Sequence, residues 1–163
     1  MLKNSLLFGS VAGVLTIGTY LSAYYSNKPF VFAPWLIFGT YLYYVAAMYF
    51  AATRTRDMTE GPFTWREALR PAFLTFIVTN TIYYIFYYIL FQSDPSLAVI
   101  QKDIMRETLP RLATPEQLKE SMEELEKSDF RLTPGVAFLG WAQGAIFGFI
   151  LAAAIAFGTK RDA

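Results

Sequence analysis

Four long stretches of this sequence contain no charged residue, and they constrain the fold more than any other feature. The stretches are residues 6–25, 32–52, 72–91 and 135–157. The hydrocarbon core of a bilayer is about 30 Å thick, so an α-helix needs roughly 20 apolar residues to cross it. Soluble helices show a polar stripe at the helical period, and none is visible in these stretches. We therefore expect a single membrane domain that is all-α, with four transmembrane helices.

The composition narrows the chemistry that the chain can carry. Of the 163 residues, 55% are hydrophobic and only 17% are charged, which is too apolar for a soluble core of this size. Cysteine and histidine are absent, so no thiolate or imidazole serves catalysis or metal binding. No phosphate loop, nucleophile elbow or zinc motif occurs, and a net charge of +1 gives no general attraction to nucleic acid. We expect no catalytic residue, no cofactor, no metal and no nucleic-acid partner.

Basic residues beside the apolar stretches predict the orientation in the membrane. At the N-terminus, the second loop and the C-terminus, those adjoining a stretch are Lys3, Arg54, Arg56, Arg70, Lys160 and Arg161. On the other side, only Lys28 and Arg131 adjoin a stretch. Lysine and arginine near helix ends are enriched on the cytoplasmic side of membranes. We therefore place both termini in the cytoplasm and residues 92–133 in the periplasm.

Residues 92–133 form the only sizeable polar segment, and we expect a helical hairpin over residues 94–127 outside the membrane. Asp94 and Thr114 each precede a proline, as capping residues do at helix starts. Apolar residues then recur at helical spacing, first Leu97, Ile100 and Ile104, and then Leu118, Met122 and Leu125. Two short helices are marginal alone, so these stripes must also rest on the bundle, on lipid headgroups or on a partner. The excess of acidic residues argues against anionic lipid, which leaves the chain's own bundle first and partner docking second.

Small residues recur at every fourth position of the last apolar stretch. They are Gly140, Gly144, Gly148, Ala152 and Ala156, and the first stretch has a shorter series in Gly9 and Gly13. Such a stripe lets two helix backbones approach closely. We interpret it as packing inside the bundle of one chain, and the alternative is a seam with a second copy or a partner.

Polar side chains within the apolar stretches supply the remaining candidates. Amides such as Asn80 and Gln143 usually form hydrogen bonds between membrane helices, which is the interpretation we favour. Tyr41 and Tyr44 lie too deep for the ordinary aromatic belt at the membrane surface. The alternative is a polar or lipid-binding cleft, wide enough for a lipid tail or isoprenoid, formed by Asn80, Gln143, Tyr41, Tyr44, Tyr84 and Tyr88.

Two local sequences carry a resemblance to a known family. Residues 61–69 include G-P-F-T-W-R-E-A, and residues 114–148 contain P-E-Q-L-K-E-S-M-E-E-L-E, then T-P-G and a glycine-rich last helix. With its four spans, nearly the whole chain resembles a small Bacteroidetes membrane-protein family, the domain of unknown function DUF4199. The resemblance implies the inner membrane of a diderm bacterium and genes that often lie near a membrane-associated glycosyltransferase. It implies no site residue.

From these features we expect a non-enzymatic accessory or scaffold subunit that binds another membrane protein. The resemblance suggests a membrane-associated glycosyltransferase as that partner. The alternative is a small oligomeric transporter or a lipid- or isoprenoid-binding membrane protein. The expected partners are membrane lipids and another membrane protein or a second copy of the chain. Proton-coupled carriers normally need an intramembrane carboxylate, and the four stretches contain none.

Overall fold

The computed structural model describes residues 1–112 and 114–161, and the regular elements within these residues are all helices. The elements are α1 (Leu2–Ser26), the short 3-10 helix η1 (Lys28–Phe32), α2 (Pro34–Asp57), α3 (Trp65–Ser93), α4 (Ser96–Leu112), α5 (Pro115–Lys127) and α6 (Pro134–Thr159). Helices α1, α2, α3 and α6 contain the four apolar stretches, and each is long and apolar enough to cross a membrane.

Local signals in the sequence explain where the long helices begin. Thr64 and Glu67 form a capping box at the start of α3, since each side chain bonds the other residue's backbone N–H. The Thr133 hydroxyl accepts from the Val136 N–H at the start of α6. Proline occupies the first turn of α2 and of α6, where its missing N–H costs no helical hydrogen bond.

Helix α3 is the centre of the bundle, because α1, α2 and α6 all pack against it. It begins at Trp65, ahead of the apolar stretch, and continues through Pro71 without interruption. The Pro71 carbonyl oxygen accepts hydrogen bonds from Ser5 Oγ of α1 (3.1 Å) and Thr75 Oγ1 (2.7 Å). These two hydroxyls bond the carbonyl of the proline itself, whereas the N–H that Pro71 lacks would have bonded the Glu67 carbonyl four residues earlier.

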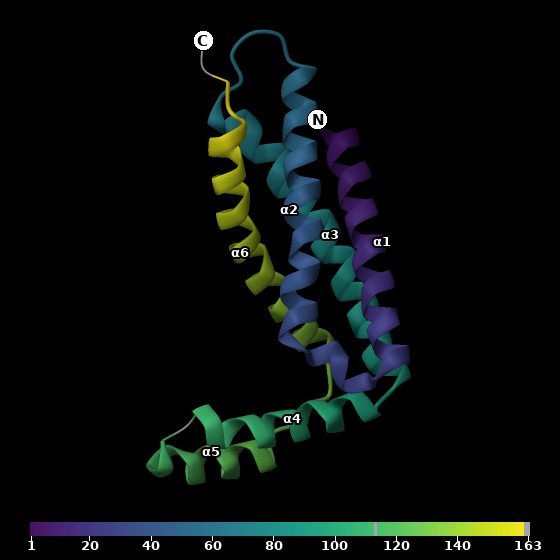
Figure 1. Cartoon of the computed structure of the whole chain (residues 1–163), viewed down its shortest axis with the longest axis vertical. Coiled ribbons are helices and arrows are strands. Elements are labelled where there is room, and N and C mark those ends of the chain that lie inside the picture. The colour runs from purple at the N-terminus through teal and green to yellow at the C-terminus, as the bar shows by residue number, and fades with distance from the viewer. Residues whose placement is uncertain (113, 162–163) are drawn as a thin grey trace.

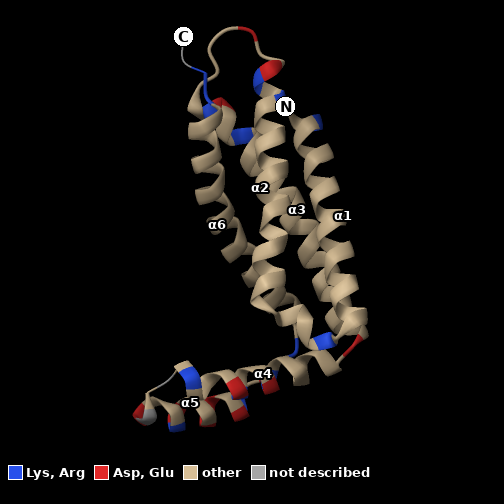
Figure 2. Cartoon of the chain, viewed as in Figure 1, with Lys and Arg blue, Asp and Glu red and all other residues tan. Residues whose placement is uncertain are grey.

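Both termini lie at one end of the bundle, and α4 and α5 lie at the other end (Figure 1). Charged residues gather at these two ends and on α4 and α5, with an uncharged zone along the bundle between them (Figure 2). Helix α4 runs across the bundle axis instead of along it, and α5 packs back against α4. We call α4 and α5 together the arm.

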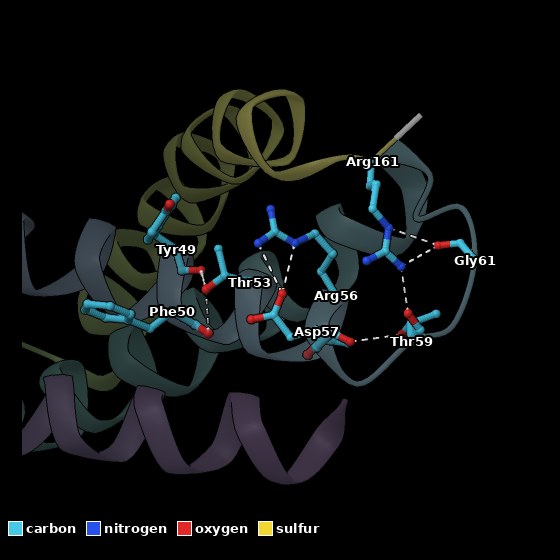
Figure 3. Close-up of polar contacts among 9 residues, drawn as sticks. Tyr49, Phe50, Thr53, Arg56, Asp57, Thr59, Gly61 and Arg161 are labelled. Atoms are coloured by element: carbon cyan, nitrogen blue, oxygen red, sulfur yellow. Dashed lines mark hydrogen bonds and ion pairs between the residues drawn. The ribbon is translucent and has the colours of Figure 1, made fainter. Parts of the chain in front are cut away.

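The end that carries the termini is closed by the segment after α6. Phe63 and Arg161 exchange two backbone hydrogen bonds, of 3.0 and 2.9 Å. The Arg161 guanidinium donates to the carbonyl oxygens of Thr59 and Gly61, as Figure 3 shows. Gly61 has a φ of +81°, a left-handed conformation that glycine adopts without steric cost. This turn presents both carbonyls to Arg161 and fixes the α2–α3 loop against α6.

Candidate functional site

The small-residue stripe of α6 lies against α3 of the same chain. A Cβ atom at Gly140 would lie 2.9 Å from Tyr84, one at Gly144 would lie 3.1 Å from Asn80, and one at Gly148 would overlap the ring of Phe76. Ala152 continues the stripe and is buried in one cluster with Ala72 and Phe76. The α3 side chains therefore occupy the space that the glycines leave free.

The shorter series of α1 lies against the opposite face of α3. A Cβ atom at Gly9 would lie 2.8 Å from Val78, and one at Gly13 would lie 2.8 Å from Ile82. Thr79 Oγ1 donates to the Gly9 carbonyl oxygen at 3.1 Å. Helix α3 is therefore held closely from both sides by helices that have small residues at the contact.

A cavity of about 210 Å³ lies among α1, α2, α3 and α6. Its aromatic and amide lining consists of Tyr20, Tyr41, Tyr44, Asn80, Tyr83 and Tyr84. Four of the six residues predicted for a cleft thus line this cavity. The other two do not, because Gln143 is exposed on α6 and Tyr88 lines a separate groove.

The predicted site residues left out five members of this lining: Thr16, Tyr20, Ile37, Thr40 and Tyr83. A repeated signal was present in the sequence, because hydroxyl and aromatic residues stand four positions apart in two helices. Thr16 and Tyr20 form such a pair in α1, and Thr40 and Tyr44 form one in α2. Residues four apart share a helix face, so the pairs mark the faces that point into the bundle.

The polar atoms of the cavity wall are only partly satisfied by the protein. Thr16 and Thr40 donate to carbonyl oxygens of their own helices, at 2.8 and 2.9 Å. Asn80 Nδ2 donates to the Trp141 carbonyl oxygen of α6 at 3.0 Å, an interhelical bond of the kind expected for this amide. Neither the Asn80 Oδ1 atom nor the Tyr44 hydroxyl has a hydrogen-bond partner among the described residues.

A groove of about 400 Å³ runs between α3 and α6 near the arm. Its wall is mostly apolar and includes Ile85, Tyr88, Phe138 and Trp141. Trp141 Nε1 donates to Thr81 Oγ1 at 3.1 Å, which fixes the indole against α3. Tyr84 lines both this groove and the cavity, so its side chain separates the two spaces.

Asp94 ties the base of the arm to the bundle. Its carboxylate lies 2.5 Å from Lys28 Nζ, and it accepts from the Tyr24 hydroxyl at 2.8 Å and from Ser96 Oγ at 2.6 Å. The hydrogen bond from Lys28, followed by those from Ser96 and Tyr24, holds the pKa of Asp94 well below its usual range. The hydrogen bond to Asp94 raises the pKa of Lys28 in turn. The pair is therefore ionised at neutral pH.

The residues of the predicted apolar stripes in the arm differ in how deeply they are buried and in what they contact. Leu97 is fully buried in a cluster with Leu90 and Phe91, at the end of α3. Leu125 is also buried, and the other predicted stripe residues are half-buried, namely Ile100, Ile104, Leu118 and Met122. Helix α5 packs against α4, so the arm meets the bundle mainly at its base.

Ion pairs join the two helices of the arm along their exposed side. Arg106 lies 2.5 Å from a carboxylate oxygen of Glu126, and Lys102 Nζ donates to the Glu126 carbonyl oxygen at 2.8 Å. These contacts raise the pKa of Arg106 and lower that of Glu126 through their mutual hydrogen bond. Helix α4 still exposes Val99, Met105 and Leu112, at 61%, 47% and 79% of their surface. The arm thus presents apolar side chains that none of the described residues covers.

The comparisons with known proteins identify a family for this chain. The family model described as protein of unknown function (DUF4199) matches residues 3–161. The chain belongs to the DUF4199 family. No curated protein and no solved structure matches the chain. Among the residues that the structure describes in this DUF4199 member, no group of three or more acidic side chains is placed to hold a metal ion.

Proposed function

We propose that this DUF4199 protein is a non-enzymatic accessory subunit of the bacterial inner membrane, in which the arm docks a second membrane protein. The observation that carries the proposal is the direction of the arm. The arm crosses the end of the bundle at its base and then extends sideways beyond it (Figure 1). If α1, α2, α3 and α6 span the bilayer, the arm runs parallel to the membrane surface and reaches over a neighbouring protein.

The surface of the arm indicates the chemistry of the partner. Helix α4 exposes three large apolar side chains (Val99, Met105 and Leu112), and Met105 and Leu112 stand seven residues apart on one helix face, an apolar patch of the kind found at the centre of interfaces. The neighbouring helix α5 adds negative charge to the arm through four exposed glutamates: Glu116, Glu120, Glu123 and Glu124. A matching partner has an apolar patch with a basic rim just outside the membrane. A membrane-associated glycosyltransferase of Bacteroidetes, which the family resemblance suggests, is the first partner to test.

The charge distribution supports a topology with both termini in the cytoplasm and the arm in the periplasm. Basic residues from α2, α3 and the segment after α6 cluster at the end that carries the termini (Figure 2). Because the chain has no cysteine, single-cysteine variants test this cleanly. In intact spheroplasts we expect an impermeant maleimide to label Ser121→Cys and to spare Thr59→Cys. The opposite labelling pattern would reverse the topology.

Replacement of the arm tests the docking proposal directly. Residues 98–128 are replaced by a short Gly/Ser linker, which retains Asp94, Leu97 and the Thr133 cap. We expect the four long helices to melt as in the parent protein, while a stoichiometric partner no longer co-purifies in mild detergent. A bundle that becomes unstable would make the arm a structural lid, and an undiminished partner would place the interface elsewhere.

A point variant separates the patch from the fold of the arm. Leu112→Ser removes an exposed apolar side chain from α4, and Met58→Ser makes a similar change at the opposite end of the bundle, where Met58 is 68% exposed. We expect partner recovery to fall only for Leu112→Ser. Equal recovery with both variants would argue against a role for this patch.

A further inference from the structure

The cavity among α1, α2, α3 and α6 takes no part in the docking proposed for the arm, yet it contains buried polar groups without partners. Tyr44 is 5% exposed and Asn80 is 3% exposed. In the described chain, every side-chain nitrogen or oxygen that is completely sealed from solvent has a hydrogen-bond partner. The Tyr44 hydroxyl and Asn80 Oδ1 have no partner in that part of the chain, so these two atoms are not sealed and face open space. Polar groups without a partner are costly in an apolar bundle, so these two atoms are positioned to bond a molecule that enters the cavity.

The ligand that suits this cavity is neutral. Asp, Glu, Lys and Arg are absent from the described residues that line it. A charged ligand in such surroundings would lose its hydration without gaining a counter-ion. Tyrosine hydroxyls donate and accept, and the free Asn80 oxygen accepts, so a group with carbonyl or hydroxyl oxygens matches the wall.

The size and walls of the cavity favour a single planar ring. Its volume of about 210 Å³ exceeds the roughly 150 Å³ of an engineered cavity that binds benzene, so a substituted six-membered ring fits. Tyrosine rings form much of the wall, with Tyr20 and Tyr83 centred 5.1 Å apart and Tyr41 and Tyr44 centred 5.4 Å apart. Such rings offer faces and edges to a flat aromatic partner. A hexose would bring more hydroxyl groups than the few free polar atoms can satisfy.

We propose that this cavity binds the neutral ring of a membrane-soluble quinone or quinol. The ring lies among the tyrosines, and its oxygens form hydrogen bonds with the Tyr44 hydroxyl and the neighbouring polar groups of the wall. Some of the lining residues are not fully buried, namely Ile37 and Tyr41 of α2, Tyr83 and Tyr84 of α3 and Gly144 of α6. The ring therefore enters from the lipid side of the bundle. This assignment is independent of the docking role of the arm.

Binding of duroquinone to the detergent-solubilised full chain, measured by calorimetry, tests the proposal. Durene is the matched control ligand, because it has the same ring and methyl groups without the oxygens. We expect saturable one-to-one binding of duroquinone and at least several-fold weaker binding of durene. Loss of one hydrogen bond in Tyr44→Phe should raise the Kd about 3- to 10-fold, because the variant keeps the ring but not the hydroxyl.

The control variant is Tyr49→Phe, which makes the same change on α2 at a side chain that is 48% exposed. Its Kd should equal that of the parent protein, and thermal melts should show that both variants are folded. The proposal fails if duroquinone does not saturate, if durene binds as tightly, or if both variants bind like the parent. Any of these outcomes would leave water as the occupant of the cavity. The variant with the Gly/Ser linker in place of residues 98–128 should still bind duroquinone.

Discussion

Two pairs of neighbouring helices in this protein, α3 with α6 and α4 with α5, are held together by opposite means. At the α3–α6 seam, glycines and alanines let side chains such as Phe76 lie directly on the facing backbone. In the arm, half-buried apolar stripes are combined with ion pairs such as Arg106–Glu126. If the bundle spans a bilayer, the lipid is as apolar as the helices and close packing must hold the seam, whereas water around the arm lets a hydrophobic stripe and charges hold it. The contrast predicts that the two pairs respond to different perturbations.

The largest effect is expected from Gly148→Leu at the α3–α6 seam. The new side chain would occupy the space of the Phe76 ring, which is fully buried and packs against Tyr44, so the ring has little room to move. Overpacking of this kind costs about 3 kcal/mol of unfolding free energy, the upper part of the usual range. Thermal melting in detergent, followed by circular dichroism, should show a clear loss of stability.

Gly158→Leu is the matched control for this variant on the same helix. A Cβ atom at Gly158 would meet nothing within 4 Å, so the added side chain points into open space. We expect a melting temperature close to that of the parent protein. If Gly148→Leu melts like Gly158→Leu, close packing does not hold the seam and the comparison fails.

An intermediate effect is expected from Leu97→Ala at the base of the arm. Leu97 is fully buried against Leu90 and Phe91, so its truncation leaves a cavity between α4 and the end of α3. We expect a local loss of about 2 kcal/mol, the lower end for a buried leucine because an end-on contact can collapse. Hydrogen exchange should speed up in α4 and α5. Equal acceleration in α6 would show that arm and bundle unfold together, contrary to the comparison.

The smallest effect is expected at the Asp94–Lys28 pair, and it depends on pH. The pKa of Asp94 is lowered by the fold, so the pair stabilises the arm base above about pH 4 and this contribution is lost as the pH falls further. The pKa of Lys28 is raised, so its contribution persists up to about pH 10.5 and is lost at higher pH. Between these limits the arm should show no pH dependence from this pair.

Asp94→Asn removes the charge at every pH. At pH 7 we expect slightly faster hydrogen exchange at the start of α4, because a weak ion pair contributes little stability. On acidification, the exchange rate of the variant should change less than that of the parent protein. The α3–α6 seam has no such pair and should exchange alike in both proteins. A seam that loosens together with the arm would show that the charges act on the whole fold.

The local features of the chain were predictable because they depend on near neighbours. The four apolar stretches, the capping box at Thr64 and the proline at the start of α6 all appear in the structure. The small-residue stripe was visible too, but not the helix against which it packs. That helix is α3, through Tyr84 and Phe76 among others, and several apolar helix faces would have looked equally suitable.

The sequence alone decided which segments are helical and apolar, since length, charge and caps act within a few residues. Only the tertiary structure decided that Asn80 faces a cavity while Gln143 of α6 faces outwards, although both are amides within apolar stretches. It also decided that the arm leaves the bundle sideways, anchored by Leu97 and Asp94. In helices with almost no polar stripe, orientation follows from non-local packing, and that information is spread over all the helices in contact.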